Sequence, residues 1–179
     1  MTMQLRVSAK EASALPMSNV LALDQSSRIT GWSVFKDGKL EAYGKFNYES
    51  YPIEERLYKI RQKVQELIID NKIDEVIMED IQMQNNVVNN VQTFKVLAEV
   101  FGVISELCVE MHKPQYAVLA SSWKHTLGIK GKDRAAQKRN AQEWVVNTYG
   151  VKPTQDIVDS ICIGVHFLKN GEKEQCAWA

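Results

Sequence analysis

The sequence is poor in cysteine, carries no net charge and contains no long hydrophobic run. Its three cysteines are an odd number and lack the spacing of a metal site. Cys108 and Cys162 fall in apolar helical patterns, so we expect small buried side chains in a reducing compartment. No run reaches the ~18 apolar residues of a membrane span, and residues 1–18 lack the apolar core of a signal peptide. We therefore expect a cytoplasmic protein with no membrane partner.

The absence of net charge hides an uneven distribution of charged residues. The 22 basic residues balance the 22 acidic ones, which argues against a uniformly basic nucleic-acid-binding protein. One segment, WKHTLGIKGKDRAAQKRNAQ at 123–142, is nevertheless strongly basic and holds a single acid. Its lysines and arginines are Lys124, Lys130, Lys132, Arg134, Lys138 and Arg139. We interpret this segment as a patch that contacts DNA phosphates, the alternative being an ordinary solvated helix face.

Length and composition indicate one globular domain. Hydrophobic residues make up 45% and charged residues 25% of the 179-residue chain, as is typical of such domains. A chain of this length buries enough apolar surface to fold without disulfides or structural metals. We expect a flexible extension at 1–18, a folded domain at 19–170 and a tail at 171–179.

Hydrophobic periodicity predicts an α/β fold. Strands are expected at Val20–Asp24, Gly31–Phe35, Leu40–Phe46, Asp74–Asp80 and Tyr116–Ala120. Helices are expected at Glu54–Asn71, through Phe94–Met111, at about Arg134–Tyr149 and at Gln155–Lys169. Asp37-Gly38 is typical of a tight hairpin turn, so the first three strands should be antiparallel. The later alternation of strands and helices predicts a mixed five-stranded sheet flanked by helices.

Four acidic residues stand where ordinary structure does not require them. Asp24 and Glu79 each end an apolar strand, and ligands of open α/β sheets bind at the carboxyl ends of strands. Asp156 and Asp159 are three residues apart on the last helix and therefore share one face. We expect the opposite face of that helix to be a buried stripe of Ile157, Ile161, Val165 and Leu168.

If the last helix packs beside the two strand ends, the four carboxylates converge. A pair of like charges at about 4 Å costs ~4 kcal/mol at an effective dielectric constant near 20, so such a cluster favours a divalent cation. Oxygen ligands without nearby Cys or His indicate Mg²⁺, with Mn²⁺ as a substitute. Two such ions in one site are a recurring device for the hydrolysis of phosphodiesters.

Each acid also has an ordinary explanation. Asp24 can belong to a turn and Glu79 to an exposed bend. Asp156 lies in the first turn of a helix, where the helix dipole favours an acid, and Asp159 can pair with a lysine. The hypothesis of a metal site therefore depends on the four acids meeting in space.

Four segments together resemble the RuvC-type Holliday-junction resolvases of the ribonuclease H-like superfamily. They are LALDQSSRITGWSV, VIMEDIQM, SSWKHTLGIKGK and QDIVDSICIG, and the resemblance extends over about Asn19–Leu168. The opening pattern, Asp-x-x-Ser-x-x-x-Gly-Trp at Asp24–Trp32, is fairly specific. So is the closing Asp-x-x-Asp-Ser pattern at Asp156–Ser160. The central Glu79 gains its weight from its position.

The resemblance implies an Mg²⁺-dependent endonuclease that cuts four-way DNA junctions. It implies that the metal-binding catalytic acids are Asp24, Glu79, Asp156 and Asp159. Lys124 matches the family lysine near the scissile phosphate, and a second basic position falls near Lys132 or Arg134. The resemblance also implies a homodimer in a bacterial or phage-infected cell, and the broad apolar face of the helix through Phe94–Met111 can serve both the core and a dimer contact.

The sequence departs from the family at one position. Members often place an aromatic residue three positions after the central glutamate, where it opens the junction, but this chain has Gln82 followed by Met83. The surrounding side-chain amides are candidates for DNA contacts instead, and they belong to Gln82, Gln84, Asn85, Asn86, Asn89 and Asn90. Their alternative interpretation is a polar loop that enters a helix.

Other functions share parts of these patterns. LDQSSRITGWSV also resembles the phosphate-binding hairpin of sugar-kinase and actin-like ATPases, which have a similar sheet but need two domains around a nucleotide. A ribonuclease H or a flap-type nuclease would use similar acids. A non-catalytic junction-binding protein would keep the basic segment and lose the acids.

Overall fold

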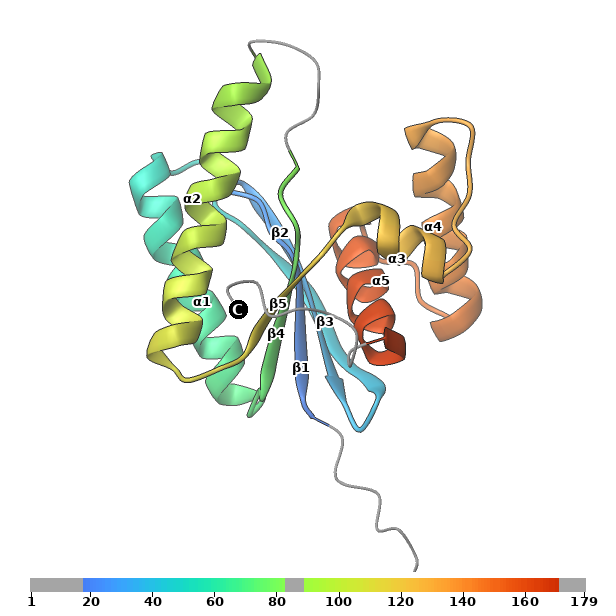
Figure 1. Ribbon diagram of the computed structural model, residues 1–179, viewed down its shortest axis with the longest axis horizontal. Helices are drawn as coiled ribbons and strands as arrows, with labels where there is room; N and C mark the ends of the chain where they lie inside the picture. The colour runs from blue at the N-terminus through green and yellow to red at the C-terminus, as the bar shows by residue number, and fades with distance from the viewer. Residues whose placement is uncertain (1–17, 83–88, 171–179) are drawn as a thin grey trace, which may run out of the picture.

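A five-stranded sheet separates two layers of helices (Figure 1). The computed structural model describes residues 18–82 and 89–170, and the side chains of Asn89 and Asn90 are not among those described. The strands are β1 (Val20–Asp24), β2 (Ile29–Lys36), β3 (Lys39–Asn47), β4 (Glu75–Glu79) and β5 (Gln115–Val118). The helices are α1 (Ile53–Asp70), α2 (Asn89–Glu110), α3 (Ala120–Thr126), α4 (Arg134–Tyr149) and α5 (Gln155–Asn170). The extension before residue 18 and the tail at 171–179 lie outside the described residues.

The sheet has the mixed topology expected from the sequence. Its strand order is β3-β2-β1-β4-β5. The hairpin turn at Asp37-Gly38 has a positive φ at both residues, and β1, β2 and β3 are antiparallel as predicted. β4 and β5 run parallel to β1 because helical crossovers precede them. The central strand β1 therefore has an antiparallel neighbour on one side and a parallel neighbour on the other.

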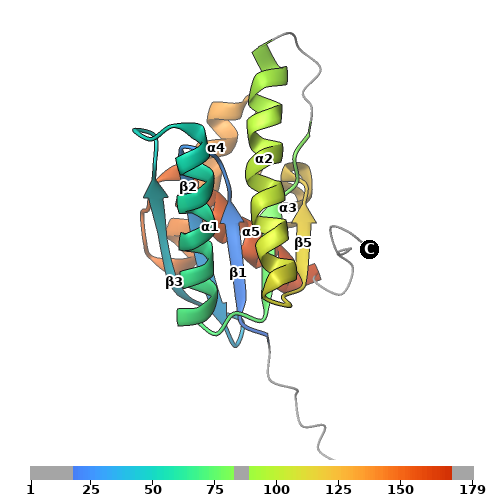
Figure 2. The ribbon, with the colours of Figure 1, turned by 90° about the vertical axis from the view of Figure 1, so that its left-hand side faces the viewer.

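Alternation along β1 sorts its side chains between two hydrophobic layers. Val20 and Ala22 pack in the layer of α5, whereas Leu21 and Leu23 pack against α1 and α2. Figure 2 shows α1 and α2 side by side across that second face. Because successive residues of a strand point to opposite faces, Asp24 continues the row of Val20 and Ala22. The strand pleat thus directs Asp24 to the face that α5 covers.

Helix α5 is buried on more sides than the sequence predicted. The expected single stripe ended at Leu168, which is only half-buried. The buried residues are instead Ile157, Val158, Ser160, Ile161, Cys162, Ile163, Gly164, Val165, His166 and Phe167. The prediction of one apolar face was wrong because α5 is enclosed between the sheet and the layer of α3 and α4 (Figure 1).

The short helix α3 was not predicted from the sequence. β5 ends at Val118 rather than at Ala120, and α3 begins at Ala120, after the single residue Leu119. Its N-cap is Leu119, which has no side chain that can cap the helix, and seven residues are too few to show a period. By contrast, α4 has the predicted bounds, an Asp133 side chain that accepts a bond from the Ala136 amide, and Gly150 in the left-handed region at its end.

Two further sequence expectations concern burial and membranes. Cys108 and Cys162 are buried thiols, as predicted, and burial raises the pKa of Cys108 to about 12. In the described part of the chain, no helix has both the length and the apolar character needed to cross a bilayer.

Gly31 on β2 allows the backbone of α5 to lie directly against the sheet. A Cβ atom at Gly31 would lie 1.9 Å from the backbone oxygen of Asp156 and 2.9 Å from the backbone nitrogen of Ile157. Gly31 is also the partner of Asp24 in the β1–β2 ladder. The first turn of α5 therefore lies directly over the end of β1, which explains the glycine in the opening sequence pattern.

We predict that Gly31→Ala destabilises the protein by about 1–3 kcal/mol, because a backbone atom of α5 must move to admit the new methyl group. Gly102→Ala is the matched control, since a Cβ atom there meets nothing within 4 Å. That exposed position in α2 should gain up to about 1 kcal/mol from the higher helix propensity of alanine. Urea unfolding of both variants measures the difference, and equal effects would contradict the close approach.

Candidate active site

A cavity of about 180 Å³ lies at the carboxyl ends of β1 and β4. The residues that line it include Asp24, Glu79, Asp156 and Asp159. The parallel register pairs Leu23 with Met78, so the next residues, Asp24 and Glu79, end adjacent strands side by side. The structure thus brings the four acids of the sequence hypothesis to one cavity, two from strand ends and two from the first turns of α5.

Burial and mutual repulsion perturb these carboxyl groups. Burial raises the pKa of Asp24 well above its ordinary value, and repulsion from Asp159, Glu79 and Asp156 raises it further. Burial likewise raises the pKa of Asp159 to about 6, with a contribution from Glu79. The pKa of Glu79 is raised mainly by burial. The cluster disfavours its own ionised form and would be relieved by positive charge in the cavity.

Three neutral side chains that the sequence hypothesis missed hold two of these acids in place. The Trp123 indole Nε1 donates to Glu79 Oε2 at 3.1 Å, and Gln155 Nε2 donates to Asp159 Oδ1 at 2.7 Å. The buried Gln25 donates from Nε2 to the Glu79 carbonyl oxygen at 2.6 Å and accepts at Oε1 from the Glu79 amide at 3.1 Å. Gln25 therefore ties the end of β4 to the residue after β1.

The positions of these donors in the sequence offered a weak signal. Trp123 was expected in the core, where it lies with 2% exposure, but its indole nitrogen also faces the cavity. Gln25 directly follows Asp24, and Trp123 directly precedes Lys124. Adjacency to a candidate residue was thus the only sequence feature that marked them.

The basic segment places three cations at the cavity. Lys124 on α3 and both Arg134 and Lys138 on α4 line it. Lys124 and Arg134 lower the pKa of Glu79, and Lys138 lowers that of Asp24, against the larger effect of burial. Of the two positions left open by the sequence, both exposed, Arg134 is among the lining residues of the cavity and Lys132 is not.

The remaining candidate DNA contacts lie away from the acids or outside the described residues. Lys130 lines an adjacent cavity together with Lys124 and His125. Gln82, at the position of the family's aromatic residue, is exposed after β4. Met83, Gln84, Asn85 and Asn86 lie outside the described residues, and so do the side chains of Asn89 and Asn90.

The donor set of the cavity fits a hard divalent cation. Its candidate ligands are carboxylate oxygens, and neither Cys nor His is among its lining residues. Among residues 18–82 and 89–170, however, no three His, Cys, Asp or Glu side chains are arranged as around a bound ion. Trp123 and Gln155 each hold one of the four acids by a hydrogen bond, to Glu79 and Asp159 respectively.

A mixed sheet in this strand order is the ribonuclease H-like fold, and acids at the ends of β1 and β4 fit a nuclease with that fold. The family model of the crossover junction endodeoxyribonuclease RuvC matches residues 20–167. The chain therefore belongs to the RuvC family of junction-resolving endonucleases. This membership favours the resolvase resemblance over the actin-like one.

Solved structures support the same fold. The RuvC of Thermus thermophilus in complex with a Holliday junction substrate is 15% identical, with a TM-score of 0.70 over 88% of this chain and 99% of that one. Another structure of Thermus thermophilus RuvC is 19% identical, with a TM-score of 0.67 and the same shares. The yeast mitochondrial Holliday junction resolvase Ydc2 is 14% identical, with a TM-score of 0.54 over 89% of this chain and 81% of that one. No match was found among curated proteins.

We predict that Asp24→Asn stabilises the protein at pH 7 in the absence of divalent cations by about 1–2 kcal/mol, because it removes a buried, repelled charge. The raised pKa of Asp24 and Asp159 means that the unfolded chain loses these protons at lower pH than the folded chain. The wild-type protein should therefore lose stability from about pH 4 to beyond pH 6. Thermal unfolding in EDTA at several pH values measures both effects.

The exposed Glu41 on β3 provides a matched control for this substitution. Glu41→Gln also removes one carboxylate charge but should change the free energy of unfolding by less than about 0.5 kcal/mol. The repulsion inferred for the cavity would be wrong if Asp24→Asn changed the free energy of unfolding as little as Glu41→Gln does. It would also be wrong if Asp24→Asn raised that free energy only at low pH.

Proposed function

We propose that this chain is a homodimeric, Mg²⁺-dependent endonuclease that resolves four-way DNA junctions by phosphodiester hydrolysis. The observation that carries the proposal is the cavity in which four carboxylates meet the basic side chains of α3 and α4. Acids alone would suit many metal sites, and basic residues alone would suit any DNA surface. Their combination at the strand ends suits a DNA phosphate bridged to protein by cations.

In this proposal the chain's own residues hold and orient the reacting groups. Asp24 and Glu79 are ligands fixed by the central strands, and Asp156 and Asp159 are ligands carried by α5. Two Mg²⁺ ions, or Mn²⁺ in their place, would activate a water molecule and stabilise the leaving 3′ oxygen.

Basic residues take the remaining roles in the proposal. Lys124 and Arg134 approach the cavity from α3 and from the first turn of α4, where they can contact the scissile phosphate. Lys130 and Lys132 are proposed to contact the DNA backbone further from the cut. The exposed Gln82 begins the amide-rich segment, with Met83, Asn85 and Asn86, that we propose as a further DNA contact.

The proposed homodimer rests on α2. Its C-terminal half packs in the core, where Val100, Ile104 and Leu107 have no exposure. In the N-terminal half, Phe94 and Leu97 are only partly buried, although we predicted from the sequence that they face inward. That end of α2 projects beyond α1 and the sheet (Figure 2). A second copy covering it would bury the apolar surface and set two cavities to cut opposed strands.

The unit proposed to carry the activity is the folded domain at 19–170. A reducing cytoplasm, in a bacterium or a phage-infected cell, suits its buried thiols Cys108 and Cys162 and its DNA substrate.

We predict that the wild-type protein cuts a labelled four-way junction in Mg²⁺ and leaves a linear duplex of the same sequence intact. Cleavage should stop in EDTA and return when Mg²⁺ or Mn²⁺ is added, because the carboxylates need a cation to approach a phosphate. Gel analysis of strand products measures this selectivity. Equal cutting of duplex, or cutting only of three-way, flap or RNA–DNA hybrid substrates, would assign the site to another nuclease activity.

We predict that Asp24→Asn reduces junction cleavage at least about 10²–10³-fold while the junction still binds. Binding persists because the basic residues of α3 and α4 are unchanged. Fluorescence anisotropy with the same labelled junction measures binding, and Glu41→Gln, which should cut normally, is the control. Junction binding by a wild-type protein that never cuts would support the non-catalytic alternative instead.

A further inference from the structure

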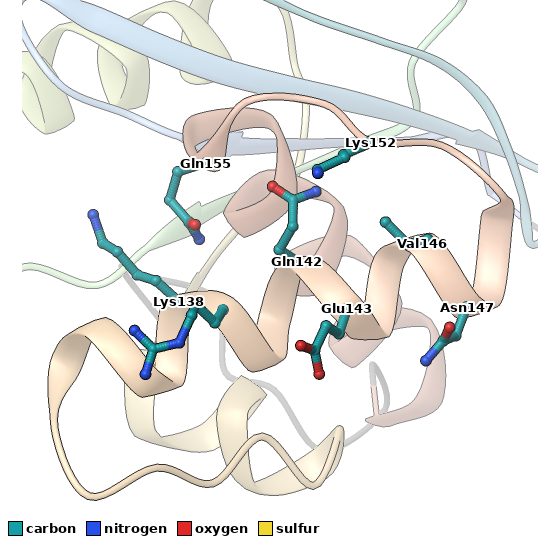
Figure 3. A pocket seen from close by; sticks show the side chains of 8 residues that line it. Lys138, Gln142, Glu143, Val146, Asn147, Lys152 and Gln155 are labelled. Atoms are coloured by element: carbon teal, nitrogen blue, oxygen red, sulfur yellow. The ribbon is translucent and has the colours of Figure 1, made fainter.

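A second cavity opens beside the carboxylate cavity and belongs to none of the roles assigned so far. It has a volume of about 490 Å³ and lies between α4 and the segment that leads into α5 (Figure 3). Lys138 and Gln155 line both cavities, so the two are adjacent. A chain-like ligand bound at the acids can therefore reach the second cavity across Lys138 and Gln155.

The lining of this cavity favours an anion. Lys138, Arg139 and Lys152 contribute three cations, against the single acid Glu143. Lys152 comes from the segment after α4 and lies outside the basic stretch that the sequence marks. In Figure 3 the Glu143 carboxylate points away from the Lys152 ammonium group, so the negative charge is on the far side of the cavity.

One buried donor in this cavity needs an acceptor. The side-chain nitrogen Nε2 of Gln142 is buried and has no hydrogen-bond partner among the described residues. Leaving a buried donor unpaired is costly, and because the Gln142 side chain as a whole is only half-buried, a turn of its amide would present this donor to a ligand that supplies an acceptor. Figure 3 shows the Gln142 amide directed toward Lys152 and the first turn of α5, where Gln155 stands.

We propose that this second cavity binds a backbone phosphate of the substrate strand, next to the phosphate that is cut. The inference rests on the proposed function. The phosphate accepts from Gln142 Nε2 and is neutralised by Lys152, while Lys138 reaches both phosphates from the boundary of the two cavities. The apolar part of the lining, at Val146, suits contact with the adjoining sugar. The cavity thus orients the strand across the acids.

The test measures how strongly the full-length protein binds a labelled four-way junction as salt is varied. The parent for all variants is Asp24→Asn, which binds without cutting. Lys152→Gln should weaken binding roughly tenfold, as expected for loss of a charge-assisted hydrogen bond. It should also reduce the slope of log K against log salt by about 0.9, as expected for one lost phosphate contact. Lys39→Gln is the control, because Lys39 lies at the β2–β3 hairpin, at the end of the sheet opposite to the carboxyl end of β1. It should change neither the junction affinity nor the salt slope.

A second variant separates a phosphate contact from a general loss of charge. Gln142→Leu keeps the net charge and a side chain of similar volume but removes the unpaired donor, so it should raise the thermal midpoint while weakening junction binding severalfold. If Gln142 has only a structural role, Gln142→Leu should lower the thermal midpoint and leave junction binding unchanged. That outcome, or a Lys152→Gln variant indistinguishable from Lys39→Gln, would overturn the inference. If the parent protein failed to bind junctions at all, the proposed function itself would be wrong.

Discussion

The contact between the first turn of α5 and Gly31 of β2 is the constraint on which the candidate site depends. Only a residue without a side chain lets the backbone at Asp156 lie this close to the sheet. Because Gly31 pairs with Asp24, the same contact places the acids of α5 above the end of the central strand. Enclosure of α5 by the sheet and by the layer of α3 and α4 then holds it there, so that packing maintains an arrangement that electrostatics opposes.

Neighbouring side chains reduce the electrostatic cost of bringing the acids together. Burial and repulsion raise the pKa values of Asp24 and Asp159, while hydrogen bonds from Trp123 and Gln155 hold neighbouring carboxylates without neutralising them. Cations from α3 and α4 offset part of the repulsion. Under the proposed function, the site sacrifices stability of the isolated chain for affinity toward divalent cations and phosphates, as functional sites commonly do.

The sequence predicted the regular elements well because their signals are local. Alternation and an Asp-Gly turn marked the antiparallel strands, and α4 was predicted with its observed bounds because it ends at a left-handed Gly150. Helix α3 was missed because it is too short to show a period, and its residue Trp123 was interpreted only as core. The tie between Gln25 and the backbone of Glu79 joins residues 54 positions apart, and no local pattern announces such a pair.

The sequence by itself determined which residues can carry chemistry and which face of each strand they occupy, since strand alternation follows from local backbone geometry. Asp24 had to share a face with Val20 and Ala22 once β1 formed. Only the tertiary structure decided that α5 covers that face, that Arg134 rather than Lys132 lines the carboxylate cavity, and that Lys152 lines the cavity beside it. Those outcomes depend on how distant helices pack, and packing is set by contacts between segments that no single stretch of sequence contains.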